Sequence, residues 1–188
     1  EKLQNDFHYR PIEQAYESIL KGILERVSRF EIIKNINFHI IVTNGIYLRN
    51  DSDFKDTYII LEWSLICFID LLNKSVLCAK DFEEYYLDCQ AILNAYIEKY
   101  IHGVDINLFT QLYEIDNYTP MQYQIIQIFQ QIQSIFLIGH ELGHLLYPNY
   151  IGLEAEKKAD LEALETVREY MQQEKRVTVW IIIAIMLL

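Results

Sequence analysis

HELGH occupies residues 140–144 of this 188-residue chain, and EKKAD follows at residues 156–160. Residues four positions apart lie on one face of an α-helix, so His140 and His144 are expected to project side by side. Glu141 is next to the first of them. Two histidines at this spacing with an adjacent glutamate are typical of catalytic zinc sites, where the glutamate acts as general base towards the water on the metal. The pentapeptide therefore predicts a zinc-binding helix.

A catalytic zinc ion takes three protein ligands and keeps one position open, so a third ligand is needed. In the metzincin pattern a glycine and a histidine would follow His144 at its third and sixth positions, but these hold Tyr147 and Tyr150. The helical pattern breaks at residues 148–152 and then resumes, which predicts an antiparallel helical hairpin. In such a hairpin Glu156 comes level with His144 and can supply the third ligand.

Asp160 lies one further turn along the second helix of this hairpin, where it comes level with His140. A carboxylate at that place can accept the N–H of the ligand imidazole and so fix its tautomer. The two short motifs therefore predict three zinc ligands and one orienting acid from two neighbouring helical segments.

These residues resemble the glutamate-zincin (gluzincin) metallopeptidases, specifically the ImmA/IrrE-type, HtpX-type and Lit phage-exclusion peptidases. The resemblance is carried by HELGH and the E-x-x-A-D pattern, within residues 129–170. It implies a zincin-like fold and one Zn²⁺ ion per chain, with His140, His144 and Glu156 as ligands, Glu141 as general base and Asp160 as orienting acid. The interval between the second and third ligands is shorter than is usual in those families.

The resemblance implies a zinc-dependent hydrolase that cleaves peptide bonds of a protein substrate. The alternative is a non-catalytic regulatory or interaction protein that retains a zincin-like site. Glu141 argues against this alternative, because a structural zinc site needs no base and is usually closed by a fourth protein ligand. A hydroxyl or imidazole is also needed to stabilise the oxyanion of the tetrahedral intermediate, and the candidates are Tyr147, Tyr150 and His102.

Hydrophobic residues recur at helical spacing over much of the chain, which predicts a mostly helical α+β fold. Helices are expected over residues 11–30, 57–72 and 81–101, and a long helix that starts at Thr119-Pro120 and carries HELGH. Length and composition predict one compact domain over residues 1–188, or a piece of a longer chain, and the resemblance implies that this domain is metallopeptidase-like.

One stretch has the pattern of a β-strand. Apolar and polar residues alternate over residues 36–43, and Asn44-Gly45 separates this run from residues 46–48. The pattern predicts a β-hairpin, or a small sheet, beside the motif helix. Two roles are open for it: it holds a peptide substrate as an added strand, or it only covers the helical core.

The charge balance limits the partners. A formal net charge of −11 disfavours nucleic acids and anionic membrane surfaces, which both attract clustered Lys and Arg, so a protein or peptide substrate is the expected partner. Cys67, Cys78 and Cys89 are odd in number and lie in apolar helical patterns, which predicts reduced thiols and a cytoplasmic location.

Residues 177–188 are apolar apart from Thr178. A run of this length cannot cross a bilayer, which takes about 20 residues, so a buried element of the core is expected. If the chain continues past Leu188 in the same way, the run would instead begin a membrane helix.

Overall fold

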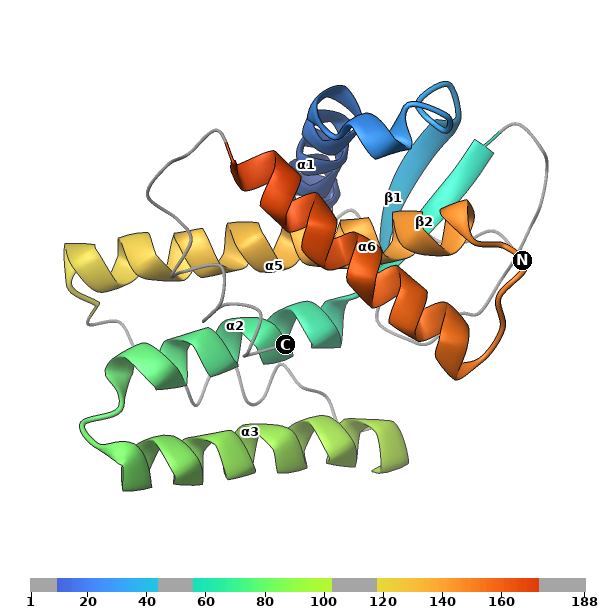
Figure 1. The fold of residues 1–188 in the computed structure, drawn as a ribbon. Helices are drawn as coiled ribbons and strands as arrows, with labels where there is room; N and C mark the ends of the chain where they lie inside the picture. The colour runs from blue at the N-terminus through green and yellow to red at the C-terminus, as the bar shows by residue number, and fades with distance from the viewer. Residues whose placement is uncertain (1–9, 44–55, 103–117, 173–188) are drawn as a thin grey trace. The chain divides into compact units, whose positions relative to one another are not determined.

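The computed structural model describes residues 10–43, 56–102 and 118–172, except for the side chains of residues 99–102 (Figure 1). This part of the protein is mostly helical and has one small sheet of two parallel strands, so the α+β class is confirmed. The elements in chain order are α1 (Arg10–Arg26), the 3₁₀ turn η1 (Ser28–Phe30), β1 (Asn37–Thr43), β2 (Asp56–Glu62), α2 (Trp63–Cys78), α3 (Phe82–His102), α5 (Pro120–Leu146) and α6 (Leu153–Met171).

The chain divides into two compact units, residues 1–61 with 133–178 and residues 62–132 with 179–188. Among the described residues, the first unit contains α1, η1, the sheet, the C-terminal part of α5 and all of α6. The second unit contains α2, α3 and the N-terminal part of α5. One domain over residues 1–188 stays a prediction.

The long motif helix α5 begins at Pro120, as predicted. Thr119 caps it: its Oγ1 accepts the amide of Gln122 at 3.2 Å, and Gln122 Oε1 accepts the amide of Thr119 at 2.9 Å. This reciprocal pair is a capping box, which satisfies amides that have no partner inside the helix. Gln122 Nε2 also donates to the carbonyl oxygen of Leu77, which ties the start of α5 to the end of α2.

The strand predicted at residues 36–43 is present as β1, but its described partner is not the predicted one. β1 pairs with β2 in parallel, and His39 on β1 stacks on Tyr58 of β2 with ring centroids 5.3 Å apart. Residues 46–48, the predicted second strand of a hairpin, lie outside the described residues. The sheet of the first unit is therefore a parallel pair that a longer connection joins.

The helix predicted over residues 57–72 is wrong for its first six residues. Residues 57–62 belong to β2, and α2 begins only at Trp63. The whole stretch is apolar on nearly every face, and periodicity alone does not separate a buried strand from a buried helix. Tyr58, Ile59 and Ile60 lie together in this segment, and such β-branched and aromatic residues favour a strand.

The edge of β1 that faces away from β2 meets α1. The amide of Val42 donates to Oε1 of the buried Glu13 at 3.1 Å. Successive amides of a strand point to opposite edges, so the amide of Ile41 points towards β2. At Val42 the outer edge of β1 is already occupied by a side chain of α1, which removes this donor from any added peptide strand.

The remaining predicted helices are present with small differences. α1 ends at Arg26, and η1 follows it before the predicted end at residue 30. α3 runs from Phe82 to His102, and Asp81 Oδ1 accepts the amide of Glu84 at 2.9 Å, as expected of the predicted cap. The turn of η1 has a physical basis in Val27 and Phe30, which are both fully buried and hold this segment in the core.

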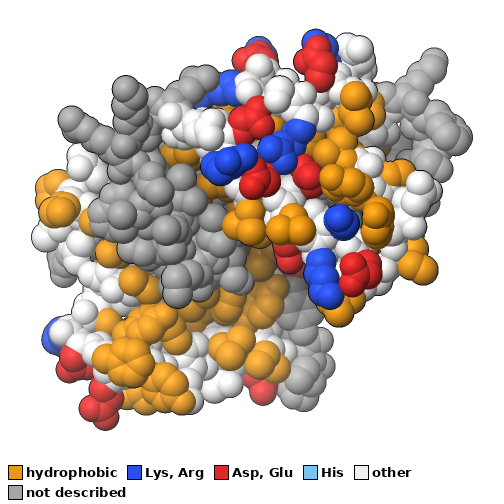
Figure 2. Space-filling view, viewed as in Figure 1, with side chains coloured by type: hydrophobic (Ala, Val, Ile, Leu, Met, Phe, Trp, Pro, Cys, Tyr) orange, Lys and Arg blue, Asp and Glu red, His pale blue; other side chains and the backbone are white. Residues whose placement is uncertain are grey.

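The second unit exposes an apolar stripe along α3. The stripe consists of Phe82, Tyr86, Leu93 and Ile97, which share one helix face, and Figure 2 shows apolar side chains gathered over this helix. Another face of α3 packs against α2, where the rings of Phe68 and Tyr96 lie 4.7 Å apart.

No disulfide joins Cys67, Cys78 and Cys89, as predicted, and the first of them is buried. None of the described helices combines the length and the apolarity that crossing a bilayer requires. Residues 177–188, for which a buried core element was predicted, lie outside the described residues.

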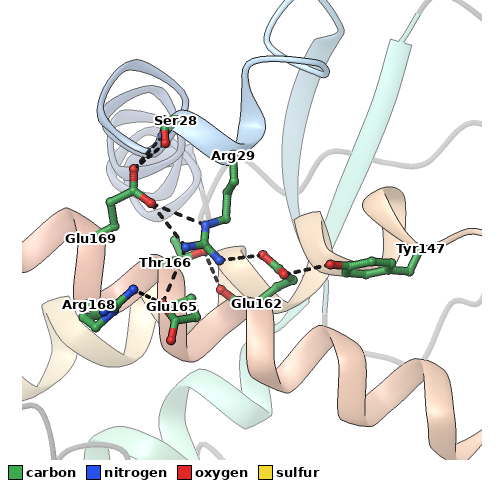
Figure 3. Close-up of polar contacts among 8 residues, drawn as sticks. All are labelled: Ser28, Arg29, Tyr147, Glu162, Glu165, Thr166, Arg168 and Glu169. Atoms are coloured by element: carbon green, nitrogen blue, oxygen red, sulfur yellow. Dashed lines mark hydrogen bonds and ion pairs between the residues drawn. The ribbon is translucent and has the colours of Figure 1, made fainter.

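In the first unit, α6 packs against α1 and η1 near its C-terminal end. Ser28 donates twice to Glu169 Oε1, from its amide at 2.7 Å and from its hydroxyl at 3.0 Å (Figure 3). Burial acts to raise the pKa of Glu169, but the hydrogen bonds from Ser28 and the charge of Arg29 outweigh it. The pKa of Glu169 therefore lies below its ordinary value, and the ionised form stabilises this junction.

We predict that Glu169→Gln lowers the free energy of unfolding by about 1–2 kcal/mol at pH 7, because charge-assisted hydrogen bonds are lost. A carboxyl whose pKa is lowered in the folded state stabilises it above the ordinary pKa of 4.5, and this contribution is lost as the pH falls through the folded pKa. Urea unfolding of both proteins from pH 7 to pH 3 should therefore show the difference shrinking below about pH 4.5. Glu165→Gln, which removes a carboxylate that does not bind Ser28, is the control with the smaller effect, and a difference independent of pH would contradict the assignment.

Candidate metal centre

His140, His144 and Glu156 come together at the hairpin of α5 and α6. The Nε2 atoms of the two histidines are 3.1 Å apart, and Glu156 Oε2 lies 3.3 Å from the first and 3.6 Å from the second. α5 supplies the histidines one turn apart, and α6 supplies the glutamate from its first turn. Among the described residues, no fourth His, Cys, Asp or Glu side chain completes this group.

These separations fit a zinc ion. With Zn–N distances of about 2.0–2.1 Å and Zn–O distances of about 2.0–2.2 Å, tetrahedral ligand atoms lie about 3.3–3.5 Å apart. The observed separations of 3.1, 3.3 and 3.6 Å lie around that range. Two imidazoles and one carboxylate form a donor set typical of catalytic zinc, which leaves one position for water or substrate. The Glu156 side chain is 56% exposed, so this position can be reached from solvent.

The orienting acid lies where the hairpin register predicts it. His140 Nδ1 donates to Asp160 Oδ1 at 2.9 Å. Because this nitrogen carries the proton, the lone pair of His140 is on Nε2, the atom that faces His144 and Glu156. The hydrogen bond also fixes the plane of the imidazole ring, which lies edge-on to that of His144 at an interplanar angle of 83°.

Glu141 is half-buried and close enough to the other three side chains for their charges to act on it. Burial raises the pKa of Glu141 above the ordinary value of 4.5, Glu156 adds to this rise, and the two histidines act against it. No hydrogen bond or ion pair joins the Glu141 carboxylate to another described residue. A partly desolvated carboxylate without a hydrogen-bond partner is suited to accept a proton from a molecule beside it.

Small residues allow the two helices to approach closely enough to form this group. A Cβ atom on Gly143 would lie 2.9 Å from the Cα of Ala159, and one on Gly139 would lie 3.1 Å from the Cα of Ala163. Both alanines are fully buried. The backbones thus meet at two places one turn apart, and the order of the pairs shows that the helices are antiparallel, as predicted. Sequence reasoning missed this contact, although its signal, G-x-x-x-G facing A-x-x-x-A, can be read in the chain.

The connection between the two helices depends on a proline and a glycine. α5 ends at Leu146, two residues before Pro148, because a proline disfavours helical geometry in the residue that precedes it. Gly152 caps α6 with φ +58° and ψ −143°, a conformation that residues with a Cβ rarely adopt. Its carbonyl oxygen accepts the amides of Ala155 and Glu156, so the third ligand belongs to a well-anchored first turn.

The described contacts of Tyr147 and Tyr150, two of the predicted oxyanion stabilisers, are not with the metal ligands. The Tyr147 hydroxyl donates to Glu162 Oε1 at 2.9 Å, and this bond raises the pKa of Tyr147. Tyr150 is exposed at the turn, where its ring meets that of Tyr147 edge-on. His102 is the last residue of α3, and its side chain lies outside the described residues. An oxyanion role for these three residues stays a prediction.

Exposed leucines lie on both sides of the carboxylates of α6. Leu153 lies one turn before Glu156, and Leu164 lies one turn after Asp160, so all four share one stripe of the helix. Apolar surface beside the His140, His144 and Glu156 side chains is suited to hold apolar side chains of a peptide.

We predict that Asp160→Ala weakens zinc affinity by about 10–100-fold without unfolding the protein, because His140 loses the acceptor that orients it. Competition with a chromophoric chelator measures the affinity, and circular dichroism checks the fold. Glu154→Gln, another exposed acid on the same helix, is the control and should bind zinc as the wild type does. Equal affinity in Asp160→Ala would show that the contact does not orient the ligand.

We predict that Gly143→Ala lowers the free energy of unfolding by about 1–3 kcal/mol and weakens zinc binding by about tenfold. The added methyl group meets the backbone of Ala159, which can yield only if α6 moves away from α5. Leu161→Ala is the control, because it shortens a side chain of α6 that is 56% exposed. Unchanged zinc affinity in a folded Gly143→Ala protein would mean that the ligand geometry tolerates a wider helix spacing.

No family model, curated protein or solved structure matches this chain. The resemblance of HELGH and E-x-x-A-D to the gluzincins stays a prediction. The described residues themselves provide a group of three side chains that could hold a metal ion. Asp160 accepts a hydrogen bond from one of the two histidines, and the Glu141 carboxylate lies near the group.

Proposed function

We propose that this protein is a zinc-dependent metallopeptidase that hydrolyses peptide bonds of a protein substrate. The observation that carries the proposal is the His140–His144–Glu156 group, whose donor atoms are separated as in a tetrahedral zinc site and which no fourth described residue closes. A site with three protein ligands is typical of catalytic rather than structural zinc. Glu141, half-buried and without a hydrogen-bond partner among the described residues, supplies the base that hydrolysis needs.

The two histidines and Glu156 would hold the zinc ion, which when bound polarises a carbonyl group and makes water acidic near neutral pH. Glu141 accepts a proton from the attacking water as the new C–O bond forms at the scissile carbonyl. Glu141 then returns this proton to the amine nitrogen as the C–N bond breaks. Asp160 keeps the imidazole of His140 in the tautomer that leaves Nε2 available.

The substrate is proposed to be a peptide segment of a protein. The exposed leucines beside the ligand carboxylates support this class, because they offer apolar surface on both sides of the reacting group. The net charge of −11 argues against nucleic acids as partners. A cytoplasmic location is proposed because the three cysteines form no disulfide, which is typical of reducing compartments.

The alternative function is a regulatory or interaction protein that binds zinc without catalysis. It shares the metal group with the first proposal, so metal binding alone does not separate the two. The half-buried Glu141 favours the peptidase. Partial burial of a carboxyl without a hydrogen-bond partner lowers the stability of the fold, and service as a catalytic base is a reason for such a residue to be present. Replacement of Glu141 therefore discriminates between the two functions.

We predict about one zinc ion per purified chain, strongly reduced in His140→Ala, His144→Ala and Glu156→Ala, but retained in Glu141→Gln. Elemental analysis after dialysis against metal-free buffer measures the occupancy. Wild type should cleave fluorescein-labelled casein or an internally quenched peptide library, and Glu141→Gln should lose at least about 100-fold of this activity. Full occupancy in Glu156→Ala would disprove the ligand assignment. Zinc binding with no cleavage in any wild-type assay would favour the non-catalytic alternative.

A further inference from the structure

A second polar cluster of the first unit lies on a different face of α6 from the zinc ligands. Glu162, Glu165 and Glu169 follow one another at three- and four-residue spacing, so they form one stripe. Glu162 comes two residues after Asp160, which places this stripe about 200° around the helix from the orienting acid. Figure 3 shows the cluster, and Figure 2 shows acidic and basic side chains mixed over α6 on this face of the molecule.

Arg29 of η1 binds all three carboxylates of this stripe. Its Nη1 is 3.0 Å from Glu162 Oε2, and its Nη2 is 3.5 Å from Glu165 Oε2 and 3.4 Å from Glu169 Oε2. The Arg29 side chain is only 26% exposed and the Glu162 side chain only 14%, so water screens their attraction less than at an open surface. The planar guanidinium has donors in fixed directions, and three such contacts along one stripe resist rotation of α6 about its axis.

Glu162 connects this arginine to the zinc helix. Its second oxygen, Oε1, accepts the Tyr147 hydroxyl at 2.9 Å, and Tyr147 directly follows the last residue of α5. Thr166 also donates to the backbone carbonyl oxygen of Glu162 at 2.6 Å. A continuous chain of polar contacts thus runs from η1 through α6 to the end of the helix that carries His140 and His144.

The zinc group needs such a restraint. Gly143 and Gly139 bring α5 close to the backbones of α6, where Thr166 and the Cβ of Glu162 also pack. The contacts of Arg29 add a polar restraint to this packing. A slip of one residue would move Glu156 by about 1.5 Å along α6 and about 100° around it. Either displacement would move the Glu156 carboxylate away from the two imidazoles, because its Oε2 lies only 3.3 Å from Nε2 of His140 and 3.6 Å from Nε2 of His144.

We propose that Arg29 is a positioning residue that fixes the register of α6 against α5, through Glu162 and Tyr147, and so sets the geometry of the His140–His144–Glu156 group. The residue touches neither metal nor substrate and acts only through the two helices. The inference rests on the proposed zinc site, and it assigns a role in that site to a residue more than a hundred positions away in sequence.

The test compares Arg29→Met and Tyr147→Phe with the control Arg168→Met in the full chain. Arg168 pairs with Glu165 within α6 and does not connect two segments, and its side chain is 63% exposed. Zinc affinity is measured by chelator competition, and the visible absorption of the cobalt(II)-loaded protein reports the ligand geometry. Circular dichroism and thermal unfolding establish that each variant is folded at the temperature used.

Arg29→Met should weaken zinc binding about tenfold and shift or weaken the cobalt(II) bands, while Arg168→Met should stay within about twofold of wild type. Tyr147→Phe removes one hydroxyl and keeps the ring, so it should change affinity in the same direction by a smaller factor. Glu162→Gln combined with Arg29→Met should lose no more affinity than Arg29→Met alone, because both break one chain of contacts.

If Arg29→Met does not fold, Tyr147→Phe carries the test by the same two measurements. Lower thermal stability with unchanged zinc affinity and unchanged cobalt(II) spectra in both variants would overturn the positioning role and leave the zinc site standing. A wild-type protein that binds neither zinc nor cobalt(II) would instead overturn the proposed function on which the inference rests.

Discussion

The contact between the backbones of α5 and α6 is the constraint on which the candidate site depends. Glycines on one helix face alanines on the other, and the side chain of the buried Thr166 packs beside Gly139. Side chains on the neighbouring stripe of each helix can therefore meet, and these are the two histidines, Glu156 and Asp160. A bulkier interface would hold the same residues in the same order and separate their donor atoms. The distance between two helix axes thus decides whether a metal group exists.

α6 has a different chemistry on each of its faces. One stripe carries the ligand carboxylate and the orienting acid, the next carries the alanines that meet α5, and a third carries the acids that bind Ser28 and Arg29. The same helix is therefore held from the side opposite to the one where it serves the metal group.

Much of the site could be predicted from sequence because its determinants are local. HELGH and EKKAD lie close together in the chain, so helical periodicity and one turn are enough to place Glu156 near His144 and Asp160 near His140. The contacts that fix the register could not be predicted in this way, since Arg29 is remote in sequence from Glu162 and no periodicity connects them. The glycine and alanine pattern was readable, but small residues are common and have no chemistry that draws attention.

The errors in the fold also have physical causes. β2 was interpreted as helix because residues 57–62 run without a break into the apolar start of α2. Burial alternates along β2, with Ile59 and Leu61 buried and Tyr58 exposed, but Tyr58 and Ile60 are also apolar or aromatic, so the sequence does not show this alternation. The partner of β1 was placed at the nearest strand-like segment, residues 46–48, because Asn-Gly is a strong hairpin signal. The described pairing is parallel and crosses a longer connection, which local turn chemistry does not reveal.

The short interval between the second histidine and the third ligand has a consequence for the unfolded chain. All three donors lie within residues 140–156, so the loop that closes when they meet is small and the entropy lost in closing it is modest. Metal ions can then associate with the denatured ensemble as well as with the folded protein, and only the difference between the two affinities adds to stability. A zinc ion bound at the proposed site would therefore raise the melting temperature by less than its affinity for the folded protein alone suggests.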